Sequence, residues 1–236
     1  MRRKALLTAL VVASGAIPAV SMADFSANAG WVSEYIYRGV YQEDSSAYGG
    51  FDYEDDSGFY VGVWGADVGV GLETDLYFGY GGETDGGFGY SVGWTGYFYT
   101  ENDPPSSATP GFYDTITEIN LGVSYGIFAL DHAIGEEDGW GSPTDYTFTT
   151  ITISPEKGPY YSFNSFGDQY SGEYIEIGYS WALEDVDLNV AFLWAPDVPS
   201  ASNPDPKYVL LLSEDVGYAE TALTFGISKS FGIGED

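Results

Sequence analysis

The sequence contains no cysteine, one histidine and only seven lysine and arginine residues among its 236 residues. Without cysteine, an exported chain has no disulfide bond to hold its fold together, so another device is needed, such as a closed ring of backbone hydrogen bonds. The scarcity of basic residues argues against nucleic acid as a partner, because binding to phosphate needs clustered Lys and Arg. Beyond the N-terminal segment, no stretch approaches the roughly 18 apolar residues of a spanning helix.

Residues 1–23 have the pattern of a secretory signal peptide. Residues 2–4 are basic, residues 5–20 are apolar and residues 21–23 form a small-residue cleavage site. Removing them leaves four basic residues against 36 acidic ones, a formal net charge of −32 (4 − 36). The sequence therefore predicts an exported, acidic chain with one domain over residues 24–236.

Aromatic residues and glycine are abundant, and they recur with a two-residue period. In residues 220–231, one face carries larger apolar side chains and the other very small polar ones. Residues 72–82 show the cleanest alternation in the chain. A large apolar face opposed by a small polar face is typical of a strand with lipid on one side and water on the other.

Strands of this kind predict an all-β fold, a transmembrane antiparallel up-and-down β-barrel of about twelve strands, with ten to fourteen left open. Long loops are expected at 102–111, 136–143 and 196–217, the last with a β excursion at 208–213 that is excluded because bacterial barrels have even strand numbers. Both chain ends are then expected on the periplasmic side. The expected strands are 28–40, 48–54, 59–67, 72–82, 88–98, 115–125, 127–134, 146–154, 160–164, 173–181, 188–194 and 220–231.

Four stretches of the chain resemble the TorF family, porin-like β-barrels of Gram-negative outer membranes. They are SANAGWVSEYIYRG (26–39), GFDYEDDSGFYVGVWG (50–65), ETDLYFGYGGE (73–83) and GISKSF (226–231). The resemblance implies a small barrel with a pore, inserted into outer-membrane lipid by the barrel assembly machinery. It brings no catalytic motif and no cofactor. The five residues after Phe231 depart from the usual ending on a terminal aromatic residue.

Charged and amide side chains fall on the face expected to line the lumen, with aromatic residues such as Tyr35 and Tyr37 expected outside. A wet lumen tolerates such charges, whereas Arg or Lys facing lipid at mid-bilayer costs about 2–4 kcal/mol. The carboxylates predict a preference for cations, with Arg38 pairing across to Glu34 or Asp75 and narrowing the lumen. The alternative is a structural polar network that fills a closed barrel. The predicted pore-lining residues are Glu34, Arg38, Asp52, Glu54, Asp75, Glu118, Asn120, Glu176 and Asn189.

Two matches to G-x-S-x-G, at 89–93 and 122–126, raise the possibility of a hydrolase. The nucleophile elbow of hydrolases needs a strand, a sharp turn and a helix, whereas Ser91 and Ser124 lie in or at the end of alternating strands. The acidic clusters at 52–56 and 136–138 have oxygen ligands that suit Ca²⁺ but no EF-hand spacing. We therefore predict no enzyme, no metal site and no cofactor.

The function expected from these patterns is passive diffusion of small hydrophilic, cationic solutes through an outer-membrane channel. Tyr97 and Tyr99, on the inward face, are candidates for guiding sugars. The alternatives are a non-conducting structural or adhesive barrel, an outer-membrane hydrolase that uses Ser91 and His132, and a soluble periplasmic sandwich. The sequence predicts neither the particular solute nor an oligomeric state.

Overall fold

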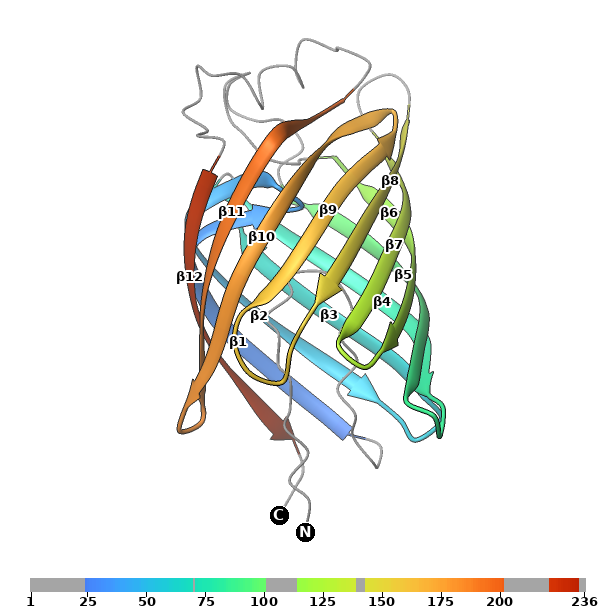
Figure 1. Cartoon of the computed structure of the whole chain (residues 1–236). Helices are drawn as coiled ribbons and strands as arrows, with labels where there is room; N and C mark the ends of the chain where they lie inside the picture. Colours follow the sequence, from blue (N-terminus) through green and yellow to red (C-terminus); the bar gives the residue numbers. More distant parts are fainter. Residues whose placement is uncertain (1–23, 70, 101–113, 139–142, 202–220, 234–236) are drawn as a thin grey trace.

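The computed structural model describes residues 24–69, 71–100, 114–138, 143–201 and 221–233, which form one closed β-barrel (Figure 1). In these ranges the chain forms twelve strands: β1 (Asp24–Tyr37), β2 (Val40–Glu54), β3 (Phe59–Asp67), β4 (Leu72–Glu83), β5 (Phe88–Tyr99), β6 (Ile116–Tyr125), β7 (Phe128–Glu137), β8 (Thr144–Ile153), β9 (Tyr160–Asp168), β10 (Tyr170–Leu183), β11 (Val186–Ala201) and β12 (Thr221–Ile233).

Each strand pairs antiparallel with its neighbours in sequence, and β1 pairs with β12 from Phe25↔Ile233 to Val32↔Gly226. The ring therefore has no free edge along this ladder, which is how a barrel satisfies its backbone groups without a disulfide. The predicted fold class and the predicted number of strands are confirmed. The described residues include no helix long and apolar enough to span a membrane.

Three predicted features lie outside the described residues: the signal peptide at 1–23, the loop at 102–111 and the excursion at 208–213. The predicted start of the last long loop, at Pro196, is wrong, because β11 continues to Ala201 in register with β10. That segment contains two prolines, yet pairing with the long strand β10 keeps it extended.

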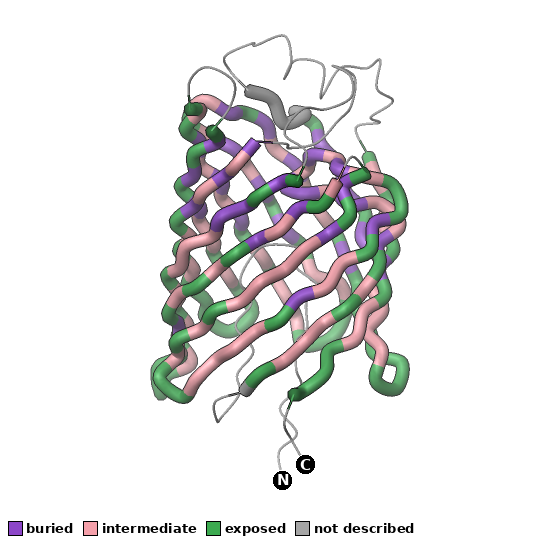
Figure 2. Tube along the Cα trace, turned by 180° about the vertical axis from the view of Figure 1, so that it is seen from behind, coloured by how far each residue is buried: buried purple, intermediate pink, exposed green. Residues whose placement is uncertain are grey.

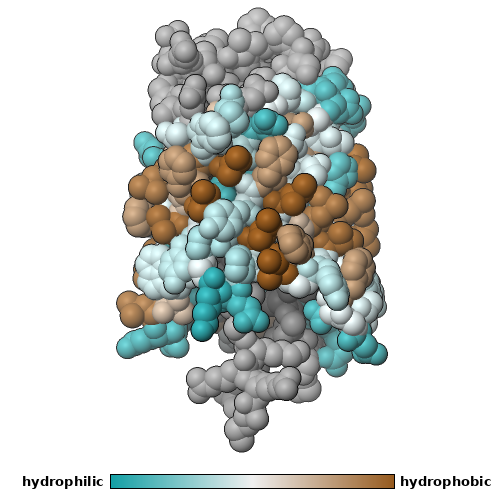
Figure 3. All heavy atoms as spheres, in the orientation of Figure 1, coloured by the Kyte–Doolittle hydropathy of each residue, from teal (hydrophilic) through white to brown (hydrophobic). Residues whose placement is uncertain are grey.

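The outer face of the barrel carries the large apolar side chains. On β4, Leu72, Leu76, Phe78 and Tyr80 are exposed, as the alternation of residues 72–82 predicts. Figure 3 shows brown apolar residues gathered over the middle of the visible face, with teal polar residues nearer its lower end. A band of this kind matches the lipid-facing surface of a membrane barrel.

Small residues on the inner face give room to tyrosine rings. A Cβ at Gly62 would overlap the ring of Tyr77, and one at Gly79 would overlap the ring of Tyr60. These rings therefore lie flat against the wall only because glycine stands beneath them. The buried residues gather toward the upper end of the barrel, whereas the lower rim is mostly exposed (Figure 2).

The upper part of the first hairpin does not follow the predicted pattern. Strand β2 begins at Val40 rather than at 48, so the gap left between the predicted strands 28–40 and 48–54 lies inside a strand. Tyr35 and Tyr37, predicted to face outward, are each only 2% exposed. This correction has a physical cause: residues 33–45 leave the wall, and the alternation set by the lower part of β1 does not continue through them.

Candidate functional site: a hairpin inside the barrel

The inner hairpin, residues 33–45, separates from β12 at a serine. The ladder between β1 and β12 ends at Val32↔Gly226, and the amide of Phe225 then donates to Ser33 Oγ (2.8 Å) instead of to a strand carbonyl. Val32 and Tyr35 are both buried although they are three positions apart, so the side-chain alternation reverses between them. Beyond Ser33, the hairpin is free to turn away from the wall.

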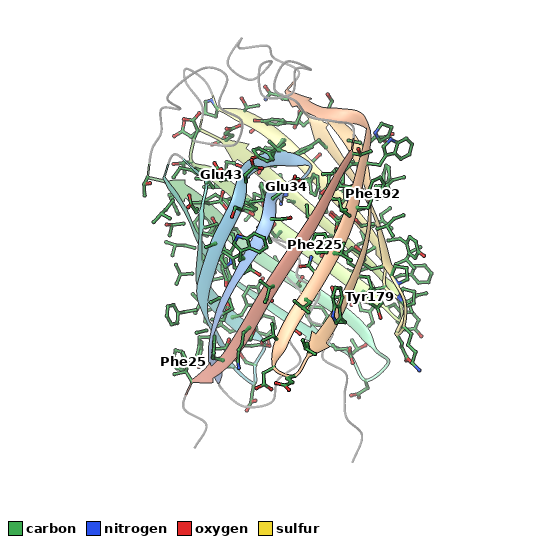
Figure 4. All side chains as sticks on the ribbon, turned by 90° about the vertical axis from the view of Figure 1, so that its left-hand side faces the viewer. Phe25, Glu34, Glu43, Tyr179, Phe192 and Phe225 are labelled. Atoms are coloured by element: carbon green, nitrogen blue, oxygen red, sulfur yellow. The ribbon has the colours of Figure 1, made fainter. Side chains whose placement is uncertain are left out.

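A matching break separates the inner hairpin from β3. Ser45 has a positive φ of 60°, and Ser46 Oγ donates to the Asp67 carbonyl (2.7 Å) above the last ladder pair, Tyr48↔Ala66. Trp31 Nε1 donates to Ser45 Oγ (3.0 Å) at the base of the hairpin. Figure 4 labels Glu34 and Glu43 on this part of the chain, near the upper end of the barrel.

Arg38 and Gly39 form the two-residue turn of the inner hairpin. Both have positive φ, 52° and 78°, as the type I′ turn preferred by tight hairpins requires. A positive φ is common for glycine and rare for arginine. The contacts of the Arg38 side chain therefore help to hold its backbone in this conformation.

Arg38 makes a bidentate ion pair with Glu118 of β6. Its Nη2 lies 2.8 Å from Glu118 Oε2, and its Nη1 donates to Oε1. The exposed fraction is 6% for the Arg38 side chain and zero for that of Glu118. Paired forks of this kind are the strongest and most directional ion pairs in proteins.

Aromatic rings surround the guanidinium. Its Cζ lies 4.6 Å from the ring centre of Phe148 and 5.9 Å from that of Tyr146, both on β8, and 4.9 Å from that of Tyr37. These distances are within the range of cation–π attraction, which strengthens where water is excluded. Glu118 also accepts hydrogen bonds from Tyr97 Oη (3.1 Å) and from Tyr146 Oη.

Two further carboxyl groups lie buried on β4 close to this pair. Tyr35 Oη donates to Glu73 Oε1 (2.5 Å), which fixes the side of the inner hairpin to the wall. Asp75 is only 4% exposed, and its Oδ1 has no hydrogen-bond partner among the described residues. In this part of the barrel, three buried carboxyl groups on β4 and β6 thus accompany one guanidinium, which pairs with Glu118, so the described acidic groups outnumber the basic ones.

Aromatic packing closes the barrel at the level of the inner hairpin. Tyr37 packs on Tyr97 with ring centres 5.4 Å apart, and Phe148 packs on Phe166 at 4.7 Å. Ile116, the register partner of Tyr97, has no exposed surface. The buried cluster draws on both the hairpin and the wall strands. The described side chains thus fill the lumen at this height.

The predicted pore-lining residues divide into those at the hairpin and those elsewhere. Arg38, Asp75 and Glu118 come together, but Arg38 pairs with Glu118 and not with Glu34 or Asp75, so the predicted pairing is wrong. Glu34 lies on the inner hairpin itself, opposite Asp44. Away from the hairpin, Asp52 bonds Asn28 (3.2 Å) and Tyr77, Asn120 bonds Thr95 (3.0 Å), Glu176 bonds Tyr160 (2.6 Å), and Glu54 and Asn189 lie outside the cluster.

Of the wall residues around Arg38, the sequence predicts inward positions for Glu118 and Tyr97 but does not single out Tyr146 and Phe148. Tyr146 and Phe148 share the inward parity of β8, so alternation offered a signal for them. Tyr97 and Tyr99 have the predicted inward placement, but they pack in the closed level of the barrel. Tyr35 and Tyr37 gave no signal, because the reversal near Ser33 depends on Phe225, a residue far along the chain.

The structure does not bring together the residues of the hydrolase alternative. Ser91 lies on the inner face against Gly122. His132 belongs to the opposite, outward row of β7, where its Nδ1 lies 2.9 Å from Thr149 Oγ1. The described residues also contain no cluster of three or more His, Cys, Asp or Glu side chains that could hold a metal ion.

Comparison with known proteins identifies a family and a fold. A family described as "Bacterial protein of unknown function (Gcw_chp)" matches residues 16–192. The structure is similar to one reported under "Unveiling the Mechanism Behind the in-meso Crystallization of Membrane Proteins", with a TM-score of 0.56, 8% identity, and coverage of 90% of this chain and 85% of that one. No curated protein sequence matches the chain.

Weaker structural similarity extends to two named outer-membrane proteins. Pseudomonas aeruginosa OccK2 (OpdF) gives a TM-score of 0.40 at 10% identity, over 86% of this chain and 62% of that one. OmpT, an outer membrane protein of Vibrio cholerae, gives 0.29 at 10% identity, over 89% and 99%. The resemblance to the TorF family has no counterpart among these matches.

Proposed function

We propose that this chain, which belongs to the Gcw_chp family of bacterial proteins of unknown function, is an outer-membrane channel for the passive diffusion of small hydrophilic cations, gated by its inner hairpin. The observation that carries the proposal is the ion pair between Arg38 at the tip of the hairpin and Glu118 on the far wall. One basic group, carried by the hairpin, closes a lumen whose other charged side chains, among the described residues, are acidic.

The outer surface supports placement in a membrane. Its exposed aromatic and aliphatic side chains form a band that would be costly to leave in water and that lipid would cover. We propose outer-membrane lipid as the surroundings of this band and the barrel assembly machinery as the partner during insertion.

The charge of the inner face supports a preference for cations. Asp52, Asp75, Glu118 and Glu176 lie on that face, and Arg38 is the basic residue there among those described. Lys157 lies in the turn between β8 and β9, and Lys229 lies 3.5 Å from Asp185 near a strand end. Acidic side chains along a narrow passage attract cations and repel anions.

The attachment of the inner hairpin supports a gating role. Residues 33–45 pair with each other but not with β12 or β3, so they can move without opening the barrel ladder. Such a movement breaks the Arg38–Glu118 pair and the Tyr35–Glu73 hydrogen bond. Segments that lack ladder bonds to the rest of a sheet open more easily than the whole fold.

Single-channel recording in a planar bilayer under a salt gradient tests this proposal. We expect brief cation-selective openings from the native chain and long openings from Arg38→Ala. Lys157→Ala is the matched control, because it removes the same charge from an exposed turn. Equal currents from all three proteins, or anion selectivity, would contradict the proposal.

A non-conducting structural barrel is the second candidate, and the filled level of the lumen favours it. Ile116 and Glu118 have almost no exposed surface, as in a core that never opens. Silence from folded native chain and from folded Arg38→Ala would support this candidate over the channel.

A further inference from the structure

We infer that the barrel wall contains a binding site for guanidinium-type organic cations and that Arg38 occupies this site as an internal ligand. The site would take a solute that carries a guanidinium group when the inner hairpin moves away. The role of the site in transport rests on the proposed function, whereas binding at the site can be measured without any current.

The groups that receive Arg38 come from the wall, with Tyr37 of the hairpin as the exception. Glu118 of β6 supplies both oxygens of the ion pair, and Tyr97 of β5 orients that carboxylate. Phe148 and Tyr146 of β8 supply ring faces near the guanidinium. These wall residues belong to strands that are in register on both sides, so they stay in place when the hairpin leaves.

The geometry favours guanidinium over a simple ammonium ion. A carboxylate whose orientation is fixed can accept two parallel N–H groups in its own plane. A planar guanidinium offers two such groups, whereas a compact ammonium ion does not. Stacking against aromatic rings also suits a planar, weakly hydrated cation. Glu118 keeps its orientation through two phenol donors even without Arg38.

Buried polar atoms beside the ion pair show that Arg38 does not satisfy the site completely. The Nε of Arg38 has no hydrogen-bond partner among the described residues, and neither has Oδ1 of the buried Asp75. Asp75 is the register partner of Tyr97, so its carboxyl group lies beside the site. The spare acceptor and the excess of carboxyl groups favour a ligand that brings further N–H donors or positive charge.

Competition with Arg38 determines how binding is observed. A tethered side chain acts at an effective concentration of about millimolar or above, so a free cation displaces it poorly from the native chain. The truncated variant Arg38→Ala removes this competitor and leaves the wall site intact. Binding of guanidinium should therefore be strong in the variant and weak in the native chain.

Thermal unfolding of purified Arg38→Ala in detergent, with guanidinium chloride at about 1–10 mM, tests the inference. These concentrations are far below those that denature proteins. A ligand that binds the folded state raises the transition temperature with concentration. We expect such a rise in Arg38→Ala, with no rise in equal sodium chloride or urea, and a loss of the effect in Arg38→Ala/Glu118→Gln.

Other outcomes would contradict either the existence of the site or its preference for guanidinium. Equal transition temperatures of Arg38→Ala in guanidinium and sodium chloride would overturn the site. Equal stabilisation by methylammonium would overturn the assignment to guanidinium, because it would mean that only charge is recognised. If Arg38→Ala does not fold alone, its refolding yield becomes the readout, and a yield that guanidinium does not raise would overturn the site.

The same variant separates this inference from the proposed function. Cation currents in Arg38→Ala that guanidinium neither blocks nor slows would keep the channel and overturn the site. Stabilisation by guanidinium in a folded but silent Arg38→Ala would keep the site and overturn the channel. Current interruptions that appear with guanidinium and disappear with Glu118→Gln would support both.

Discussion

Strand β4 and the inner hairpin both contain alternating aromatic and polar residues, yet only β4 follows its alternation. Strand β4 pairs with β3 and β5 along its length, so its side chains point in and out in turn. The inner hairpin has a ladder partner only in itself. Without wall strands on both sides, the direction of its side chains depends on distant contacts, chiefly that of Arg38 with Glu118.

Removal of Glu118 should produce the largest difference in stability between the inner hairpin and β4. Glu118→Ala leaves the buried Arg38 without its partner, a change that costs about 3–5 kcal/mol. We expect hydrogen exchange of residues 35–43 to speed up roughly 10²- to 10³-fold, while the amides of β4 keep their protection. Glu83→Ala, at an exposed strand end, is the control. Equal loss of protection in β4 would show that the hairpin is part of the wall's cooperative unit.

Tyr35→Phe should have the next largest effect. It leaves Glu73 Oε1 without its donor while the ring stays in place, and a buried acceptor without a partner costs about 1–3 kcal/mol. The frequency of channel openings should rise about 5- to 100-fold. Tyr53→Phe, which keeps its ring contact with Phe25 at the lower rim, should leave the frequency unchanged. No change in Tyr35→Phe would mean that Glu73 does not help to hold the hairpin.

Ser33→Ala should have a smaller effect, at the point where the hairpin leaves the wall. It removes the acceptor of the Phe225 amide, a hydrogen bond worth about 0.5–1.5 kcal/mol. Exchange at the Phe225 amide should speed up about 2- to 10-fold, with Ser230→Ala as the exposed control. An unaltered rate would show that water replaces Ser33 without cost.

The smallest effect is expected in the turn between β2 and β3, which belongs to the wall. The hydroxyl of Ser57, with backbone amides, lowers the pKa of the Asp55 carboxyl in the folded chain. A lowered pKa contributes stability above the unfolded pKa, and this is lost as the pH falls through the folded value. Ser57→Ala should therefore weaken the acid dependence of heat stability. An identical pH profile would contradict this role of Ser57.

The wall could be predicted because its information is local. Alternation over residues 72–82 identifies the faces of β4, and the same parity places Asp75, Tyr97 and Glu118 on the inner face. Their part in conduction stays a prediction. Alternation gives the face of a residue but neither its height in the barrel nor the residue across the lumen.

The inner hairpin could not be predicted because its information is long-range. Arg38 and Glu118 are 80 positions apart, and Ser33 and Phe225 are 192 apart. The sequence around Ser33 continues a regular strand pattern, which predicts a strand through to Val40. The dipeptide Arg38-Gly39 is the one local turn signal in this segment. The place where the chain bends is set by the hydrogen bond from the Phe225 amide of β12 to Ser33.

Conductance of a chain without the tip of the hairpin tests the gate most directly. Glu34 and Asp44 are register partners, so an Asn-Gly turn can join them in place of residues 35–43. If the inner hairpin closes the channel, the folded, heat-modifiable variant should carry a steady cation-selective current where the native chain opens only briefly. A folded variant that stays as silent as a closed native chain would contradict the gating role.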